Sequence, residues 1–259
     1  MFERSDVTDS HCAGVSFEIS DINALARAIA LILVQEFSLA TQLASNSTVV
    51  AQEVFLELSE IESIISLRLK PENRYHRDGF LFQLIMWLSS HLDLSPGDLV
   101  SLPHVQAAAK GQDSLIIHRA SGNVIALSIC EDKATENPRK TIRDEVWGEI
   151  QKYEKGERDD ELRSGVISIL GGGGIGTAEA ESLIRGISWK GRRRHRVRVT
   201  IEGARTTGLF KGFATVITGP HEMRRGETMI LPEMRTWMDD FASRVEGNLR
   251  TFIRVPDNV

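Results

Sequence analysis

The chain has 259 residues, 41% of them hydrophobic and 26% charged, and its formal net charge at pH 7 is −5. This composition is typical of a globular protein, and its acidic balance excludes a protein that coats nucleic acid through bulk positive charge, so such binding would need a local basic patch. The two cysteines, Cys12 and Cys130, exclude a disulfide framework and favour the reducing cytoplasm, and no apolar stretch is long enough to predict a membrane span.

Residues 1–75 are expected to form an N-terminal helical segment, beginning with a poorly fixed arm over residues 1–20. After Asp21, a suitable N-cap, apolar side chains recur at helical spacing at Ile22, Leu25, Ile29 and Leu33. A second apolar-periodic segment runs from about residue 50 to residue 69 and ends before Pro71. The pattern therefore predicts two helices between residues 21 and 70.

Residues 76–259 are expected to form one domain of the α/β (α+β) class, with a mixed central sheet flanked by helices. The segment FLFQLIMWLSSHL predicts an apolar helix, and SLIIH and NVIALSIC, separated by RASG, predict a β-hairpin. A helix should then begin at Thr141 and end at Gly156, with a single apolar stripe made of Ile142, Val146, Ile150 and Tyr153.

The last third of the chain is expected to alternate between strands and helices. GVISIL predicts a buried strand, GGGGIG a turn and TAEAESLIRGI a helix, while RHRVRVTIE and FATVITG predict two further strands. The segment that starts at MRRGET is expected to close the chain with a helix whose core stripe is formed by Met234, Met238, Phe241 and Val245.

The hairpin brings chemistry-bearing residues to one end of one face. With Gly122 as the middle of the turn, residues equally far from it face one another, so Asp113 lies opposite Glu131. The same register pairs Leu115 with Ile129 and Ile117 with Leu127. Lys133 points to the face of Glu131, and Asp132 points to the other face. That other face carries Ala126, Ser128 and Cys130, whose small side chains would let a helix approach closely.

Two carboxylates at cross-strand distance repel each other unless a cation lies between them or one is protonated. Mg²⁺ prefers oxygen ligands and often uses one or two carboxylates, with waters or substrate oxygens completing its shell. Asp113 and Glu131 are therefore predicted to hold Mg²⁺ or Mn²⁺, and Lys133 to position water or stabilise the transition state of phosphodiester hydrolysis. The alternative is an exposed hairpin end with an ordinary Glu131–Lys133 ion pair.

This arrangement resembles the PD-(D/E)XK nuclease superfamily, in which an acidic residue on one strand of a hairpin meets an acidic residue, any residue and a lysine on the next. The resemblance covers about residues 79–170, including a helix before the hairpin, where GFLFQ places Gln83 at the position of a usual glutamate. It implies a restriction-endonuclease-like fold and a Mg²⁺-dependent endonuclease, with DNA the expected substrate. By analogy it also implies control by a partner protein, such as a helicase or ATPase, in anti-phage defence.

Two groups of basic residues are candidates for contacting the nucleic acid. In WKGRRRHRVRVTIEG, Arg194, Arg196 and Arg198 alternate along a predicted strand and line one face, which suits phosphate contacts. The other group, Arg139, Lys140 and Arg143, follows directly after the hairpin. The alternative for both groups is a solvated helix or strand face, and the strand arginines could also pair with the acidic run near Asp159.

The segment GGGGIG supports a competing hypothesis. Gly171, Gly173 and Gly176 have the GxGxxG spacing, between a predicted strand and a predicted helix, and the next strand ends in Glu202. This pattern is that of a dinucleotide-binding turn, although a flexible glycine-rich turn explains it equally simply. Three hypotheses therefore stand: a metal-dependent nuclease, a non-catalytic nucleic-acid-binding module of the same fold, and a dinucleotide-binding enzyme.

Overall fold

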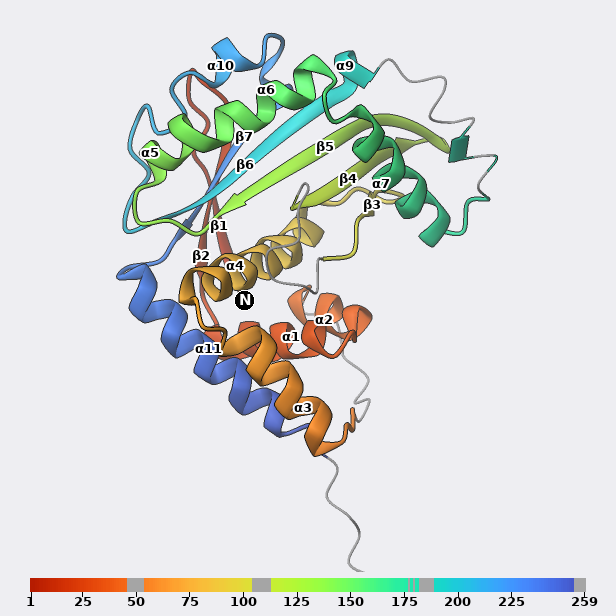
Figure 1. Ribbon diagram of the computed structural model, residues 1–259. Coiled ribbons are helices and arrows are strands. Elements are labelled where there is room, and N and C mark those ends of the chain that lie inside the picture. Colours follow the sequence, from red (N-terminus) through yellow and green to blue (C-terminus); the bar gives the residue numbers. More distant parts are fainter. Residues whose placement is uncertain (46–53, 104–112, 177, 179, 182–188, 254–259) are drawn as a thin grey trace, which may run out of the picture.

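The computed structural model describes residues 1–45, 54–103, 113–176, 178, 180, 181 and 189–253 (Figure 1). Within them, one mixed sheet has the strand order β1-β2-β7-β6-β5-β4-β3. The middle strands β2, β7, β6 and β5 run parallel, and antiparallel hairpins close both edges. The strands are β1 (Phe2–Asp6), β2 (Ala13–Ile19), β3 (Leu99–Val100), β4 (Ser114–Ala120), β5 (Asn123–Lys133), β6 (Arg193–Ile201) and β7 (Arg224–Ile230). The predicted α/β class with a mixed, helix-flanked sheet is confirmed.

Helices cover both faces of this sheet (Figure 1). One layer contains α1 (Ile22–Leu33), α2 (Phe37–Ala44), α3 (Leu58–Ile64) with its π-helical extension (Ile65–Leu69), α4 (Arg74–Ser90) with a 3-10 turn (His91–Asp93), and α11 (Met234–Arg250). The other contains α5 (Pro138–Thr141), a π-helical turn (Ile142–Val146), α6 (Trp147–Lys155), α7 (Asp159–Gly172) and α10 (Phe213–Val216). Two short segments, α9 (Trp189–Arg192) and the 3-10 turn His221–Met223, precede β6 and β7.

The N-terminal residues belong to the central sheet. The prediction of a poorly fixed arm over residues 1–20 is wrong, because β1 pairs with β2 and β2 pairs in parallel with β7. Phe17 of β2 lies in the same apolar core as Leu25 of α1, Phe80 of α4 and Phe241 of α11. Residues 1–75 therefore share both sheet and core with the rest of the chain and do not form a separate layer.

Several predicted helices are present because their apolar stripes pack on this core. Asp21 caps α1 by accepting the N–H groups of Asn23 and Ala24 at 3.0 and 2.9 Å. The helix predicted after the hairpin runs from Pro138 to Lys155, and Gly156 ends it with φ 84°. The stripes predicted for this helix and for α11 are buried. The second helix predicted near residues 50–69 is described from Leu58 onward, and residues 46–53 lie outside the described residues.

Three predictions in the last third of the chain are wrong. GVISIL belongs to helix α7, because Leu162, Val166 and Leu170 pack at i, i+4 spacing, and a short apolar run alone does not separate a strand from a helix. FATVITG contains the short helix α10, and residues 224–230 form strand β7 before the last helix begins. β7 escaped detection because its buried centre is polar, with Glu227 and Thr228 both fully covered. Most of TAEAESLIRGI lies outside the described residues.

Candidate active site

The hairpin β4–β5 has the predicted register at its open end. Leu115 pairs with Ile129 and Ile117 with Leu127, as expected, and the last pair is Ser114 with Cys130. The turn itself differs from the prediction: Ser121 and Gly122 both adopt positive φ, at 49° and 81°, in a two-residue turn. A β-bulge beyond it inserts Ile125 and restores the predicted register.

Asp113, Glu131 and Lys133 line one open cleft of about 910 Å³. Gln83 of α4 lines the same cleft, so the four residues that were grouped from the sequence are brought together. The alternating side chains between them and the turn, Leu115, Ile117, Leu127 and Ile129, are buried against α6 and α7. Packing of this apolar stripe turns the charged end of the hairpin toward the cleft.

Asp113 is held from two sides. The Gln83 amide Nε2 donates to Asp113 Oδ1, and the Asp132 backbone N–H donates to Asp113 Oδ2 at 2.6 Å. Burial, together with the nearby Glu131 carboxylate, raises the pKa of Asp113 to about 6, and Lys133 opposes that rise. Gln83 therefore contributes by orienting Asp113 as a hydrogen-bond donor.

Glu131 and Lys133 form a close ion pair inside the cleft. The Lys133 Nζ lies 3.5 Å from Glu131 Oε2, with the glutamate side chain 8% exposed and the lysine 29% exposed. Burial raises the pKa of Glu131, and Lys133 acts against it. Burial works against the charge of Lys133, but Glu131 and Asp113 raise its pKa above the ordinary value, so it remains an ammonium.

The donor set fits a hard divalent cation. Each carboxylate has about four lone-pair positions, so Asp113 can bind a cation while accepting both of its hydrogen bonds. Among the described residues, no group of three or more histidine, cysteine, aspartate or glutamate side chains is arranged to hold a metal. A site built on Asp113 and Glu131 would thus offer two carboxylates and leave the other positions to water or substrate, the coordination that Mg²⁺ commonly has.

The opposite wall of the cleft is also acidic. The cleft is lined by six carboxylates and three cationic side chains, the carboxylates being Asp113, Glu131, Asp144, Glu145, Glu149 and Glu161 and the cations Lys133, Lys152 and Arg158. Several of these charges pair along the wall, as in the Arg158–Glu149 contact at 2.8 Å and the Lys152–Glu149 contact at 2.6 Å. The excess negative charge attracts cations and disfavours a polyanion that arrives without one.

Two of the arginines predicted to contact nucleic acid are instead buried. Arg198 is 0% exposed and Arg196 is 4% exposed, so the prediction that they contact phosphates is wrong. Arg198 pairs with Asp132, and Arg196 donates to Glu227 at 2.6 and 3.0 Å. The predicted alternation along the strand is correct, but the face that carries these arginines packs against α4 and is not open to solvent.

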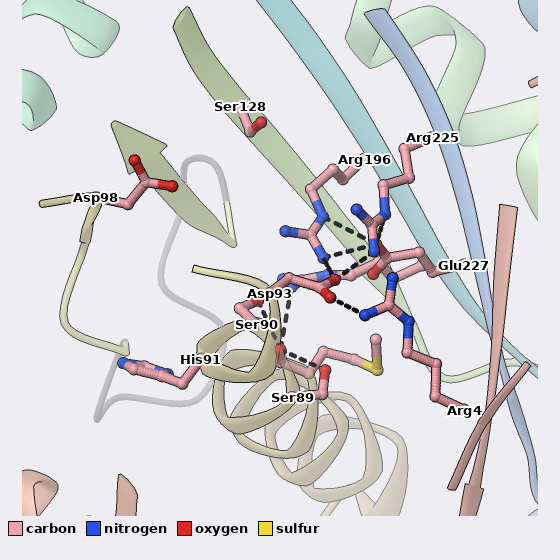
Figure 2. A network of polar contacts seen from close by, with 12 residues as sticks. Arg4, Ser89, Ser90, His91, Asp93, Asp98, Ser128, Arg196, Arg225 and Glu227 are labelled. Atoms are coloured by element: carbon pink, nitrogen blue, oxygen red, sulfur yellow. Dashed lines mark hydrogen bonds and ion pairs between the residues drawn. The ribbon is translucent and has the colours of Figure 1, made fainter. Parts of the chain in front are cut away.

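Figure 2 shows the network that Arg196 joins. Arg196 and Arg225 converge on Glu227, and Asp93 accepts from Arg225 and Arg4. Asp93 thereby links the turn after α4 to strands β1, β6 and β7. In these ion pairs the charges of Arg196 and Arg225 are matched by carboxylates of the same chain.

The remaining basic candidates are dispersed. Arg194 is half-buried beside a cavity of about 200 Å³ that Arg196 and Arg225 also line. Arg139 donates to the backbone carbonyls of Leu209 and Lys211 at 3.2 and 2.8 Å and so anchors that loop. Lys140 and Arg143 are on the surface and both pair with Asp144. The described side chains of these candidates do not form a continuous basic surface around the cleft.

The glycine-rich segment lacks the strand that a dinucleotide-binding turn needs. Gly171 and Gly172 are the last residues of helix α7, and Gly174 follows with φ 82°. A pyrophosphate turn requires a strand, the glycines and then the N-terminus of a helix. Here the glycines follow a helix, so the dinucleotide-binding interpretation is contradicted.

The ion pair between Asp132 and Arg198, next to the candidate catalytic residues, was not predicted from the sequence. Asp132 was predicted to point away from the catalytic face, and it does, into a pair with Arg198. In the parallel pairing of β5 with β6, Asp132 is the register partner of Arg198. The sequence places Asp132 and Arg198 on two predicted strands, and Asp132 on the face away from the catalytic residues. Their ion pair could have been predicted only if these two strands had been known to be neighbours.

No family model matches the chain, and no curated protein sequence is significantly similar to it. In the described part of the chain, no helix combines the length and apolar character needed to cross a membrane.

Proposed function

We propose that this protein is a metal-dependent nuclease that hydrolyses phosphodiester bonds, with DNA as its substrate. The observation that carries the proposal is the convergence of Asp113, Glu131 and Lys133 on one cleft. Burial raises the pKa of both carboxyl groups, and the nearby Lys133 only partly opposes that rise. Carboxylates in that state gain most from a bound cation.

Each residue has a separate role in this proposal. Asp113 and Glu131 would hold Mg²⁺ or Mn²⁺, and Gln83 orients Asp113 through its amide. A bound cation supplies charge neutralisation at a phosphodiester oxygen and lowers the pKa of water. Lys133, held 3.5 Å from Glu131, places an ammonium at the cleft, where it stabilises negative charge that develops on the phosphate.

The acidic lining of the cleft suggests that the protein needs a partner to bind its nucleic-acid substrate. Six carboxylates outnumber the three cationic side chains that line the cleft, and Arg196 and Arg198 are buried. A polyanion would therefore bind weakly before a cation is in place. We infer that a partner protein delivers the nucleic acid. By analogy with the family that the sequence resembles, the partner to test is a helicase or ATPase of an anti-phage system. Because Arg196 and Arg198 are buried, the alternative of a non-catalytic nucleic-acid-binding module has less support.

The decisive experiment measures cleavage of plasmid DNA, single-stranded DNA and RNA with Mg²⁺, Mn²⁺ or EDTA. Asp113→Asn, Glu131→Gln and Lys133→Met should each lower the rate at least about 100-fold. Asp160→Asn, at an exposed position of α7, serves as the control and should leave the rate unchanged. Cleavage that persists in EDTA, or in the three variants, would assign the activity to another site or to a contaminant.

A further inference from the structure

Arg198 is a large, fully buried cation that connects three structural elements. Its guanidinium donates to Asp132 of β5 through Nε and through Nη2, the second contact at 2.7 Å. The same Nη2 donates to the Ser114 hydroxyl of β4 at 2.9 Å. Its Nη1 donates to the Ser90 hydroxyl and the Met86 carbonyl of α4 at 2.7 and 3.1 Å. One side chain from β6 therefore ties both strands of the hairpin to α4.

The contacts of Arg198 lie directly behind the candidate catalytic residues. Ser114 is the residue after Asp113, and Asp132 stands between Glu131 and Lys133. Because side chains alternate along a strand, holding Ser114 and Asp132 on one face sets the direction of their neighbours on the other. The Asp132 backbone N–H also donates to Asp113, so the orientation of this residue affects both strands.

Helix α4 completes the arrangement. Met86 and Ser90, which accept from Arg198, are on the same helix as Gln83, whose amide donates to Asp113. The position of α4 relative to the hairpin therefore determines whether Gln83 reaches Asp113. The Arg198 side chain hydrogen-bonds to α4, β4 and β5 at the same time.

We propose that Arg198 is a positioning residue for the nuclease reaction, acting through Asp132, Ser114 and α4 to place Asp113, Glu131 and Lys133. This inference rests on the proposed function. The planar guanidinium supplies five donors in a rigid fork, and four acceptor groups from three elements use them. A lysine at this position has a single point charge with rotatable donors, so it preserves the charge but not this geometry.

Arg196 provides a matched control two residues earlier on the same strand and face. It is also buried and also pairs with a buried carboxylate, Glu227, but among the described residues its side chain makes no ion pair or hydrogen bond with either strand of the hairpin. Arg196→Lys and Arg198→Lys should therefore perturb stability in similar ways. Only the second should disturb the catalytic residues.

The experiment compares wild type, Arg198→Lys and Arg196→Lys in steady-state cleavage and in calorimetric titration with Mn²⁺. Temperatures are chosen so that all three proteins are folded by circular dichroism. Arg198→Lys should lower kcat about 10- to 100-fold and weaken Mn²⁺ binding by a similar factor, the range for residues that orient metal ligands. KM for DNA should stay within about 3-fold, because Arg198 is fully buried and does not reach the substrate. Arg196→Lys should change each quantity by less than about 3-fold.

A second variant covers the case in which Arg198→Lys does not fold. The double change Arg198→Met with Asp132→Leu removes both buried charges together, which commonly preserves the fold. It should lose kcat and Mn²⁺ affinity to the same extent as Arg198→Lys.

Three outcomes overturn the positioning role: unchanged kcat in the folded Arg198 variants, equal losses in Arg196→Lys, or a loss confined to KM. An active wild type combined with any of these leaves the proposed function intact. A wild type that neither cleaves nor binds Mn²⁺ overturns both proposals.

Discussion

Asp113 and Glu227, two buried carboxylates on opposite faces of the central sheet, are compensated to different degrees. On the cleft side, burial and Glu131 raise the pKa of Asp113 to about 6, and Lys133 is the nearest cation to the pair. On the α4 side, Glu227 is fully buried, yet its pKa is lowered, because Arg196, Arg225 and Arg198 outweigh the effect of burial. Figure 2 shows Arg196 and Arg225 directed at Glu227.

The comparison distinguishes a carboxylate whose charge is matched by arginines of the chain from carboxylates that are proposed to bind a cation. The charge of Glu227 is matched by arginines of the same chain, which contact its Oε1. Burial raises the pKa of Asp113 and of Glu131 by more than Lys133 offsets, and in the proposed function a bound cation would supply the missing positive charge. Asp132 also lies on the α4 side, and burial raises its pKa to about 7 although Arg198 pairs with it, so a raised pKa alone does not distinguish a catalytic carboxylate from a structural one.

Glu227→Gln should have the largest effect on stability. Glutamine keeps an acceptor oxygen but removes the negative charge that Arg196 and Arg225 share, and breaking a buried ion pair costs about 3 to 5 kcal/mol. Urea denaturation at pH 7 measures the loss. Asp113→Asn is the comparison, and a similar loss in that variant would show that both faces use their carboxylates structurally.

The unfolding free energy of Asp113→Asn should differ from that of wild type in a pH-dependent way. Asp113 has a folded pKa of about 6 against an ordinary 3.8, so the folded state binds this proton more tightly than the unfolded state does. The wild type therefore loses stability as pH rises from about 4 to about 6, and the asparagine variant does not. The variant-minus-wild-type difference should increase by about 2 kcal/mol between pH 4 and pH 7 without metal. A flat difference would contradict the raised pKa of Asp113.

Mn²⁺ should stabilise the wild type and not Glu131→Gln. A cation bound only to the folded state adds about 1.4 kcal/mol at a free concentration ten times its Kd. Thermal melts with increasing Mn²⁺ detect the shift. Glu227→Gln is the control on the other face, and although it melts earlier it should retain the Mn²⁺-dependent increase. An equal increase in Glu131→Gln would place the cation elsewhere.

Arg194→Ala should produce the smallest effect. The Arg194 side chain makes no hydrogen bond or ion pair with the described residues, and it lies on the α4 side, away from the cleft lining. The unfolding free energy should change by less than about 0.5 kcal/mol. DNA affinity and its salt dependence should also be unchanged, as fluorescence anisotropy would show. A flatter salt dependence would restore Arg194 as a phosphate contact.

The sequence alone determined the local features of the site. Alternation along two strands predicted that Asp113, Glu131 and Lys133 share a face, and the apolar run FLFQLIMWLSSHL predicted α4, which carries Gln83. These features depend on side-chain periods of 2 and 3.6 residues, which can be counted within a short segment. The register at the open end was also correct, although a two-residue turn and a bulge at Ile125 produced it.

Only the tertiary structure decided how the other charges are used. Arg198 is separated from Asp132 by 66 residues, and the parallel pairing of β5 with β6 makes them partners. β7 pairs with β2 of the N-terminal segment, and β7 was not predicted as a strand because the residues at its buried centre are polar. Parallel pairing joins strands through long connections and leaves no local pattern in the chain. The same arginines that suggest a surface for phosphate in the sequence therefore become, once the strands are adjacent, the internal partners of buried acids.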